Sequence, residues 1–168
     1  MPAPDRVERV ARFLLGKDAP DLLYGAIVSA AMLAVTSLHA ESNDIVVVAT
    51  TAVIITYWLA HVYVDAVGGR LEDREHHTGQ RLVTALREST GVLLGSLPPL
   101  LVFVLARAVG ADVTDAAVAA LVFTVVMLVA GGALVAYLAG ARGLALVGEA
   151  AISGAFGGVV LALKLVLH

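Results

Sequence analysis

The sequence predicts an all-α membrane protein with five transmembrane helices, preceded by a short amphipathic helix on the cytoplasmic face. Three observations predict this class. Of the 168 residues, 60% are hydrophobic and only 15% are charged, and the mean hydropathy is +0.91. A soluble domain usually carries about 25% charged residues, so this chain would expose large apolar patches to water. The composition is the first observation and the hydropathy the second; the third is a series of long uncharged runs. Together the three observations predict that residues 1–168 form one transmembrane domain.

The composition also excludes several classes of function. A formal net charge of -3 offers no basic surface for nucleic acid. The chain has no cysteine, which excludes disulfides, thiolate nucleophiles and zinc-thiolate sites. It contains no phosphate-binding loop, no His-Glu-x-x-His motif and no nucleophile elbow. We therefore expect no enzymatic activity, no tightly bound cofactor and no nucleic-acid partner.

Five uncharged runs define the expected spans. A helix that crosses about 30 Å of hydrocarbon needs about 20 apolar residues, and the first four runs meet this length. The fifth is shorter, but Lys164 can extend its ammonium group to the interface while Leu165–Leu167 continue the apolar stretch. Four spans with a re-entrant last segment are the alternative. The expected spans are residues 22–40, 45–66, 89–108, 115–140 and 146–166, with a cytoplasmic loop at 67–88.

The distribution of Lys and Arg predicts the orientation. Nine of the eleven lie in the N-terminal segment and in the second and fourth loops, whereas Arg107 and Lys164 lie on the other side. The positive-inside rule places the nine in the cytoplasm. We therefore expect a protein of the cell membrane with its N-terminus in the cytoplasm and its C-terminus outside. The N-terminal segment lacks the apolar core of a secretory signal peptide, so the first span should remain in the mature protein.

Residues 1–20 carry a pattern of their own. Their apolar residues recur at helical spacing with charged residues around them, which is typical of an amphipathic helix on a membrane surface. A solvated tail is the alternative. The apolar positions are Val7, Val10, Ala11 and Leu14.

Small residues repeat every four positions in three of the spans. In lipid, such repeats let helix backbones approach closely and gain van der Waals contact. Because there are so many, some of them suit a contact between subunits, and we expect a homodimer in the bilayer. The repeats are Gly91 and Gly95, then Gly132, Ala136 and Gly140, and finally Ala150, Gly154, Gly158 and Ala162.

Polar side chains at membrane depth are costly and are therefore candidate functional groups. His61 lies near the inner end of the second span, and Asp65 shares its helix face four residues later. If the helix continues beyond the following pair of glycines, two more such residues extend this face. Imidazoles and carboxylates together suit Fe²⁺, Mn²⁺ or Zn²⁺ as a substrate. A plain His–Asp hydrogen bond beside a solvated charged segment is the alternative. The candidate metal ligands are His61, Asp65, Glu72, Glu75, His76 and His77.

Hydroxyl and thioether groups in the spans could line a path for a cation. Three of them lie one helical turn apart in the first span, and a methionine lies in the fourth. Ser and Thr more often bond to their own helix, and Met fills gaps. Paired prolines in the third span predict a kink, because the carbonyls they free need a neighbour or a cavity. The candidate path residues are Ser29, Met32, Thr36, Met127, Pro98 and Pro99.

Four motifs resemble those of the vacuolar iron transporter (VIT-like) family. The first span opens with Tyr24-Gly25, similar to the family's aromatic-Gly-Gly pattern. The second ends with Ala60–Tyr63, where the family has Ala-Gly-Glu-Tyr. In the third, Gly95–Leu100 resembles a Gly-Ala-x-x-Pro-Leu-x-Pro signature, and Gly132–Gly140 precedes a basic turn and a small-residue-rich last helix. The resemblance implies a five-helix dimeric carrier that exchanges Fe²⁺ or Mn²⁺ for protons and exports the metal from the cytoplasm.

The chain departs from this family at the ion site. Iron-transporting members have an acidic residue after the first-span glycines, where this chain has Val28 and Ser29. Val62 stands in place of the Glu of Ala-Gly-Glu-Tyr. We therefore expect a divergent transporter in which His61 and Asp65 replace the missing carboxylates. A non-transporting membrane scaffold on the same five-helix fold is the alternative, and a channel for small uncharged solutes is a third hypothesis.

Overall fold

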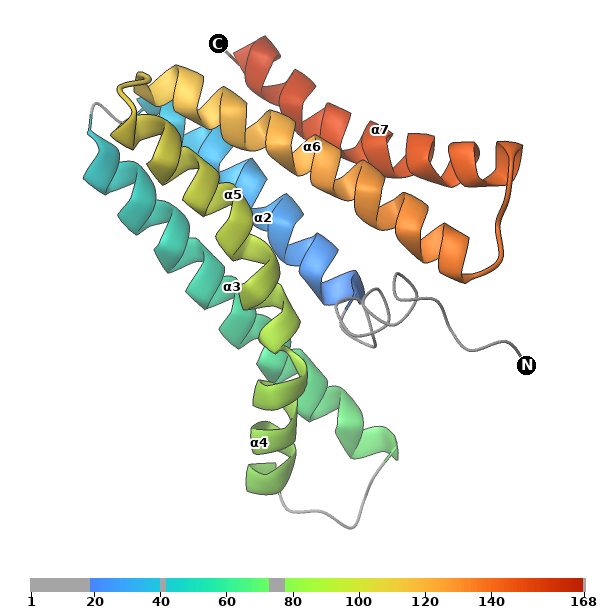
Figure 1. The fold of residues 1–168 in the computed structure, drawn as a ribbon. Coiled ribbons are helices and arrows are strands. Elements are labelled where there is room, and N and C mark those ends of the chain that lie inside the picture. The colour runs from blue at the N-terminus through green and yellow to red at the C-terminus, as the bar shows by residue number, and fades with distance from the viewer. Residues whose placement is uncertain (1–18, 40–41, 73–77, 168) are drawn as a thin grey trace.

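In the computed structural model, the described residues are 19–39, 42–72 and 78–167, and within them all the regular structure is helical (Figure 1). The expected amphipathic helix lies almost entirely outside these residues. The helices are α2 (Ala19–His39), α3 (Asn43–Glu72), α4 (Thr78–Glu88), α5 (Thr90–Ala108), α6 (Val113–Leu138) and α7 (Leu144–Leu167).

Five apolar segments in these helices are long enough to cross a membrane, as the uncharged runs predict. This is the architecture of a membrane-spanning protein. The segments are Pro20–Leu38, Asp44–Gly68, Leu82–Ala108, Val113–Leu138 and Leu144–Ala162.

The segment 67–88, which we expected to be a cytoplasmic loop, contains helical structure at both ends. α3 continues through the glycine pair to Glu72, and α4 follows as a separate helix. Ala66 of α3 packs with Ala85 of α4 in a buried cluster that Trp58 and Leu86 border. This packing offsets the cost of about 1 kcal/mol that each glycine imposes on a helix interior. α4 projects beyond the bundle beside the end of α3 (Figure 1).

α2 lies in the middle of the bundle and contacts α3, α5, α6 and α7. α6 and α7 form an antiparallel hairpin that covers one side of α2, and α3 and α5 lie on the other side (Figure 1). The N-terminal half of α2 is therefore flanked by the C-terminal half of α3. This neighbour relationship positions the candidate site described below.

Glycines bring α2 and α5 into backbone contact. A Cβ added to Gly95 would lie 1.9 Å from the carbonyl oxygen of Leu22, and one added to Gly25 would lie 2.0 Å from that of Val92. No side chain fits at these distances. In the last span the repeat is mixed, because a Cβ at Gly154 would lie 2.8 Å from Cγ2 of Val129 whereas one at Gly158 would meet nothing within 4 Å. Gly148, outside the repeat, also has open space beside it.

α5 and α6 end in the same way. Gly110 and Gly140 have φ angles of 96° and 95°, a left-handed conformation that only glycine adopts readily. In each case the glycine N–H and the following N–H bond to carbonyls of the last helical turn, as in a Schellman motif. Both helices therefore stop where the sequence supplies a glycine.

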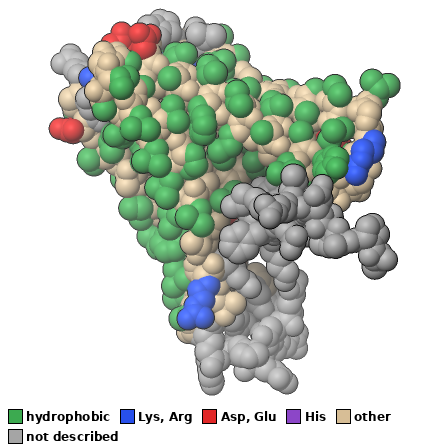
Figure 2. Space-filling model, in the orientation of Figure 1, with side chains coloured by type: hydrophobic (Ala, Val, Ile, Leu, Met, Phe, Trp, Pro, Cys, Tyr) green, Lys and Arg blue, Asp and Glu red, His purple; other side chains and the backbone are tan. Residues whose placement is uncertain are grey.

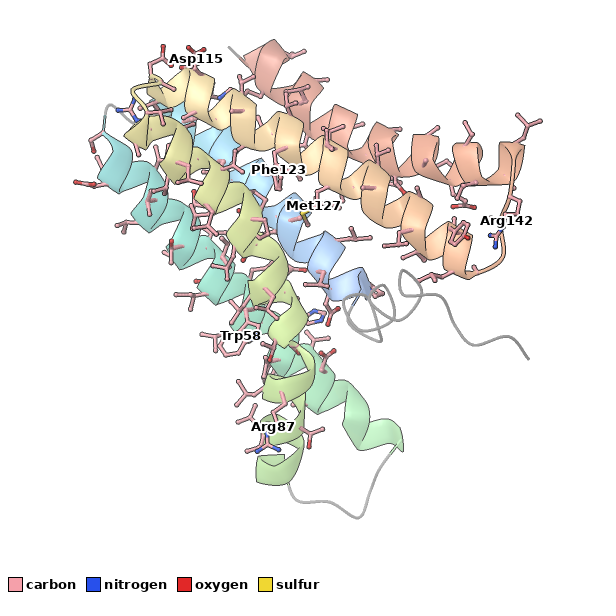
Figure 3. All side chains as sticks on the ribbon, viewed as in Figure 1. Trp58, Arg87, Asp115, Phe123, Met127 and Arg142 are labelled. Carbon is pink, nitrogen blue, oxygen red and sulfur yellow. The ribbon has the colours of Figure 1, made fainter. Side chains whose placement is uncertain are left out.

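Charged side chains mark the two ends of the bundle. Asp44, Asp112 and Asp115 lie at the end where α3 and α6 begin, which we call the acidic end. Arg87 on α4 and Arg142 in the α6–α7 turn lie away from it (Figure 3). Between the ends, hydrophobic side chains are spread over the visible face (Figure 2).

Candidate cation-binding site

Three titratable side chains from two helices meet where α2 begins. The Nε2 atom of His61 lies 3.5 Å from Oδ2 of Asp65, one helical turn along α3, which confirms that the two side chains share a face. The same Nε2 atom lies 3.8 Å from Oδ1 of Asp21 on α2. His61 and Asp21 are each 28% exposed and Asp65 is 45% exposed, so none of the three side chains is fully buried by the protein.

These contacts are longer than hydrogen bonds. An N–H···O hydrogen bond spans about 2.7–3.2 Å, and both distances exceed that range. His61 thus stands between two carboxylate groups without being tightly bound to either. Such an arrangement leaves room for a proton or a small cation to be shared among the three side chains.

A hydrogen bond from a serine between α4 and α5 fixes the carboxylate of Asp65. Ser89, between α4 and α5, donates a hydrogen bond of 3.1 Å to Oδ2 of Asp65 and is itself only 1% exposed. The bond links the end of α3 to the start of α5. It orients the carboxylate that faces His61.

Two tyrosines flank the imidazole. The rings of Tyr24 and Tyr57 lie 5.2 Å apart at 58°, and the Tyr24 ring lies 6.4 Å from that of His61. Tyr24 follows Asp21 by three residues on α2, and Tyr57 precedes His61 by four on α3. The rings therefore lie on the side of His61 that leads deeper into the bundle.

The other candidate metal ligands are not placed at this site. Glu75, His76 and His77 lie outside the described residues, and the side chain of Glu72 is likewise not described. Among the residues that the structure does describe, no group of three or more His, Cys, Asp or Glu side chains is arranged to hold a metal ion. The metal roles of these residues stay predictions.

Of the candidate path residues of α2, Ser29 is buried and Met32 and Thr36 are half-buried. Ser29 is fully buried, and its hydroxyl has no hydrogen-bond partner in the described structure. Thr36 donates to the carbonyl of Met32 at 2.7 Å, and its hydroxyl lies 3.4 Å from that of Thr50 on α3. The hydroxyl of Thr36 thus bonds back to its own helix.

Met127 and Pro98 lie elsewhere, on an apolar groove between α2, α5 and α6. The groove has a volume of about 270 Å³ and is bordered by Gly95 and Gly131, whereas Ser29 and Thr36 are not among its walls. Pro99 is buried inside α5. Ser29 and Thr36 therefore lie apart from the groove that Met127 and Pro98 line.

Asp21 and Ser89 are the members of the cluster that sequence reasoning missed. Asp21 lies in the first turn of α2. The expected topology could have revealed Asp21, because the first span begins on the same side of the membrane as the second span ends. That rule brings Asp21 and His61 to one end of the bundle.

Comparison of the chain with known proteins found no matching family model, no matching curated protein and no matching solved structure.

Proposed function

We propose that this chain is a divergent carrier of the cell membrane that exchanges a divalent transition metal, Fe²⁺ or Mn²⁺, for protons and exports the metal from the cytoplasm. The observation that supports this most directly is the position of His61 between Asp21 and Asp65, which come from two apolar helices. Ionisable groups at membrane depth are costly and are usually kept for ion or proton pathways.

The distances suit a shared cation after a small adjustment. Ligand atoms that each lie about 2.1 Å from one ion stand about 3.0–3.5 Å apart. The His61–Asp65 pair, at 3.5 Å, meets this range, and the His61–Asp21 pair, at 3.8 Å, exceeds it slightly. A movement of a few tenths of an ångström between α2 and α3 would bring the His61–Asp21 pair into this range as well.

Proton coupling follows from the chemistry of the same ligands. A histidine binds metal only when its nitrogen is unprotonated, so metal binding releases a proton. Carboxylate oxygens and imidazole nitrogen together suit Mn²⁺ and Fe²⁺ better than they suit alkali cations. Loading of the site with metal and loading with protons thus exclude each other, which is the requirement for exchange.

Uptake into proteoliposomes tests this proposal. We expect Mn²⁺ uptake driven by a pH gradient in the wild type and its loss in His61→Asn and Asp21→Asn, because either change removes a ligand. Asp115→Asn, at the acidic end, is the matched control and should transport normally. Equal uptake by the wild type and the double variant His61→Asn/Asp21→Asn would remove the cluster from the mechanism.

A non-transporting assembly protein is the second candidate, and the exposure of α7 favours it. Ile152, Phe156 and Val159 are all exposed on this helix, and Gly158 has open space beside it. This face suits a second copy of the chain or another membrane helix.

A melting scan separates the two candidate functions, since a ligand that binds only the folded form raises its stability. A carrier should melt higher with Mn²⁺, whereas a scaffold should form stable oligomers that melt alike with and without it.

A further inference from the structure

A second cavity lies at the acidic end, away from the cluster at His61. It is a groove of about 500 Å³ between α3 and α5, within the range of about 300–1,000 Å³ typical of ligand sites. Its walls include Asp44, Val47 and Val48 from the start of α3 and Phe103, Val104 and Arg107 from the end of α5.

The floor and sides of the groove are apolar. Phe103 is fully buried beneath it, whereas Val48 is 66% exposed and Val104 41% exposed. All three belong to segments long and apolar enough to cross a membrane. In a bilayer these valines would face hydrocarbon, so the groove is open to a lipid chain.

Arg107 brings an incompletely bonded guanidinium to the groove. Its Nη1 atom donates to the carbonyl oxygen of Ala111, but its buried Nε atom has no hydrogen-bond partner in the described structure. A buried donor left without a partner is costly, by about 1–3 kcal/mol. The guanidinium also lines the groove, and an oxyanion there is the acceptor that it fits best.

Asp44 supplies the opposite charge on the facing helix. It is exposed, in the first turn of α3, and lines the same groove. Within the described part of the chain, the side-chain ion pairs closer than 4 Å are those of His61. The groove thus offers a cation from α5 and an anion from α3 above an apolar floor.

We infer that this groove binds a zwitterionic phospholipid with a primary ammonium headgroup, such as phosphatidylethanolamine. Its phosphate accepts hydrogen bonds from Arg107, its ammonium donates to Asp44, and one acyl chain lies along Val47, Val48 and Val104. Charge complementarity selects this occupant. An anionic lipid would meet repulsion from Asp44, and a choline headgroup has no N–H to donate. The inference stands independently of metal transport.

Retention of defined lipids tests it. The full-length protein is equilibrated with mixed micelles that hold equal amounts of phosphatidylethanolamine, phosphatidylcholine and phosphatidylglycerol, and native mass spectrometry then counts the bound lipids. We expect phosphatidylethanolamine to be enriched at least about fivefold, as one charge-assisted hydrogen bond allows. Asp44→Asn should abolish the preference over phosphatidylglycerol, and Asp115→Asn should leave it unchanged.

Two further variants test the contribution of Arg107 and of the apolar wall. Arg107→Lys keeps the charge but loses the paired donors, and Val48→Trp fills the groove without changing any charge. Both should lower phosphatidylethanolamine retention towards that of phosphatidylcholine while the melting temperature holds. Equal retention by the wild type, Asp44→Asn and Val48→Trp would overturn the inference. So would intermolecular crosslinking of Val48→Cys to Val104→Cys, because a second copy would then occupy the groove.

Discussion

The ammonium group of Lys164 donates a hydrogen bond of 2.7 Å to the hydroxyl of Ser37, and so ties the last turn of α7 to the last turn of α2. Lys164 is only 1% exposed. The sequence suggested that this side chain reaches out to the membrane interface, but it points into the bundle instead. The partner that makes this possible, Ser37, also donates to the carbonyl of Ala34 at 3.2 Å.

The two ends of this bond should respond unequally to mutation. Ser37→Ala leaves a buried ammonium without its acceptor and should lower stability by about 1–3 kcal/mol. Lys164→Met removes the charge and keeps the apolar stem, and Ser37 retains its bond to Ala34, so the cost should stay below about 1 kcal/mol. Unfolding of both variants in matched detergent measures the difference. Equal, small losses would mean that Lys164 simply turns outward.

The contact between α2 and α5 should tolerate no added methyl group. Gly95→Ala and Gly25→Ala should each destabilise the protein by about 1–3 kcal/mol or more, because their Cβ atoms would collide with backbone carbonyls that cannot rotate away. Gly148→Ala is the matched control, with nothing within 4 Å of its Cβ. It should be neutral or slightly stabilising, since Ala favours helix by about 1 kcal/mol over Gly. Thermal unfolding of the three variants checks the order.

The start of α6 depends on a side-chain cap. Oδ1 of Asp112 accepts a 2.7 Å hydrogen bond from the N–H of Asp115. Asp112→Ala should therefore cost about 0.5–2 kcal/mol, and Asp112→Asn, which retains the acceptor, should cost less. Because the charge of Asp112 also acts on Lys164, the substitution is repeated in a Lys164→Met background. A cap effect persists there, whereas a purely electrostatic effect vanishes.

The expected orientation places the two sides of the bundle in different compartments. Since the chain has no cysteine, a thiol reagent labels only the single cysteine that each variant introduces. A membrane-impermeant thiol reagent applied to intact cells should modify Ser42→Cys, between α2 and α3, and leave Arg142→Cys unmodified until the membrane is permeabilised. Labelling of both from one side would contradict the five-span arrangement.

The helices themselves were largely predictable from local composition. Uncharged runs predicted the apolar segments of α2, α3, α6 and α7, because lipid penalises every unpaired charge within a transmembrane span. Gly110 and Gly140 end α5 and α6 through their left-handed conformation, a role that was not predicted from the sequence. The segment 67–88 was harder, since the stability of α4 depends on Ala85 meeting Ala66 of another helix.

The candidate site was predictable only in part. His61 and Asp65 lie four residues apart on one helix, so their contact follows from helical geometry alone. Asp21 is 40 positions from His61, and its contribution requires that α2 and α3 be neighbours with opposite directions. The bond from Ser89 to Asp65 likewise depends on packing, because it requires that the start of α5 lie beside α3.

Hydropathy and charge, read residue by residue, were enough to define an all-helical chain with five apolar segments and to point to His61 as an unusual polar group. They could not say which helix lies against which. That depended on shape: the absence of side chains at Gly25 and Gly95 lets two backbones touch, and the burial of Lys164 beside Ser37 fastens a third helix to them. Contacts of this kind are short-ranged and join residues far apart in the chain, so they exist only once the whole bundle has packed.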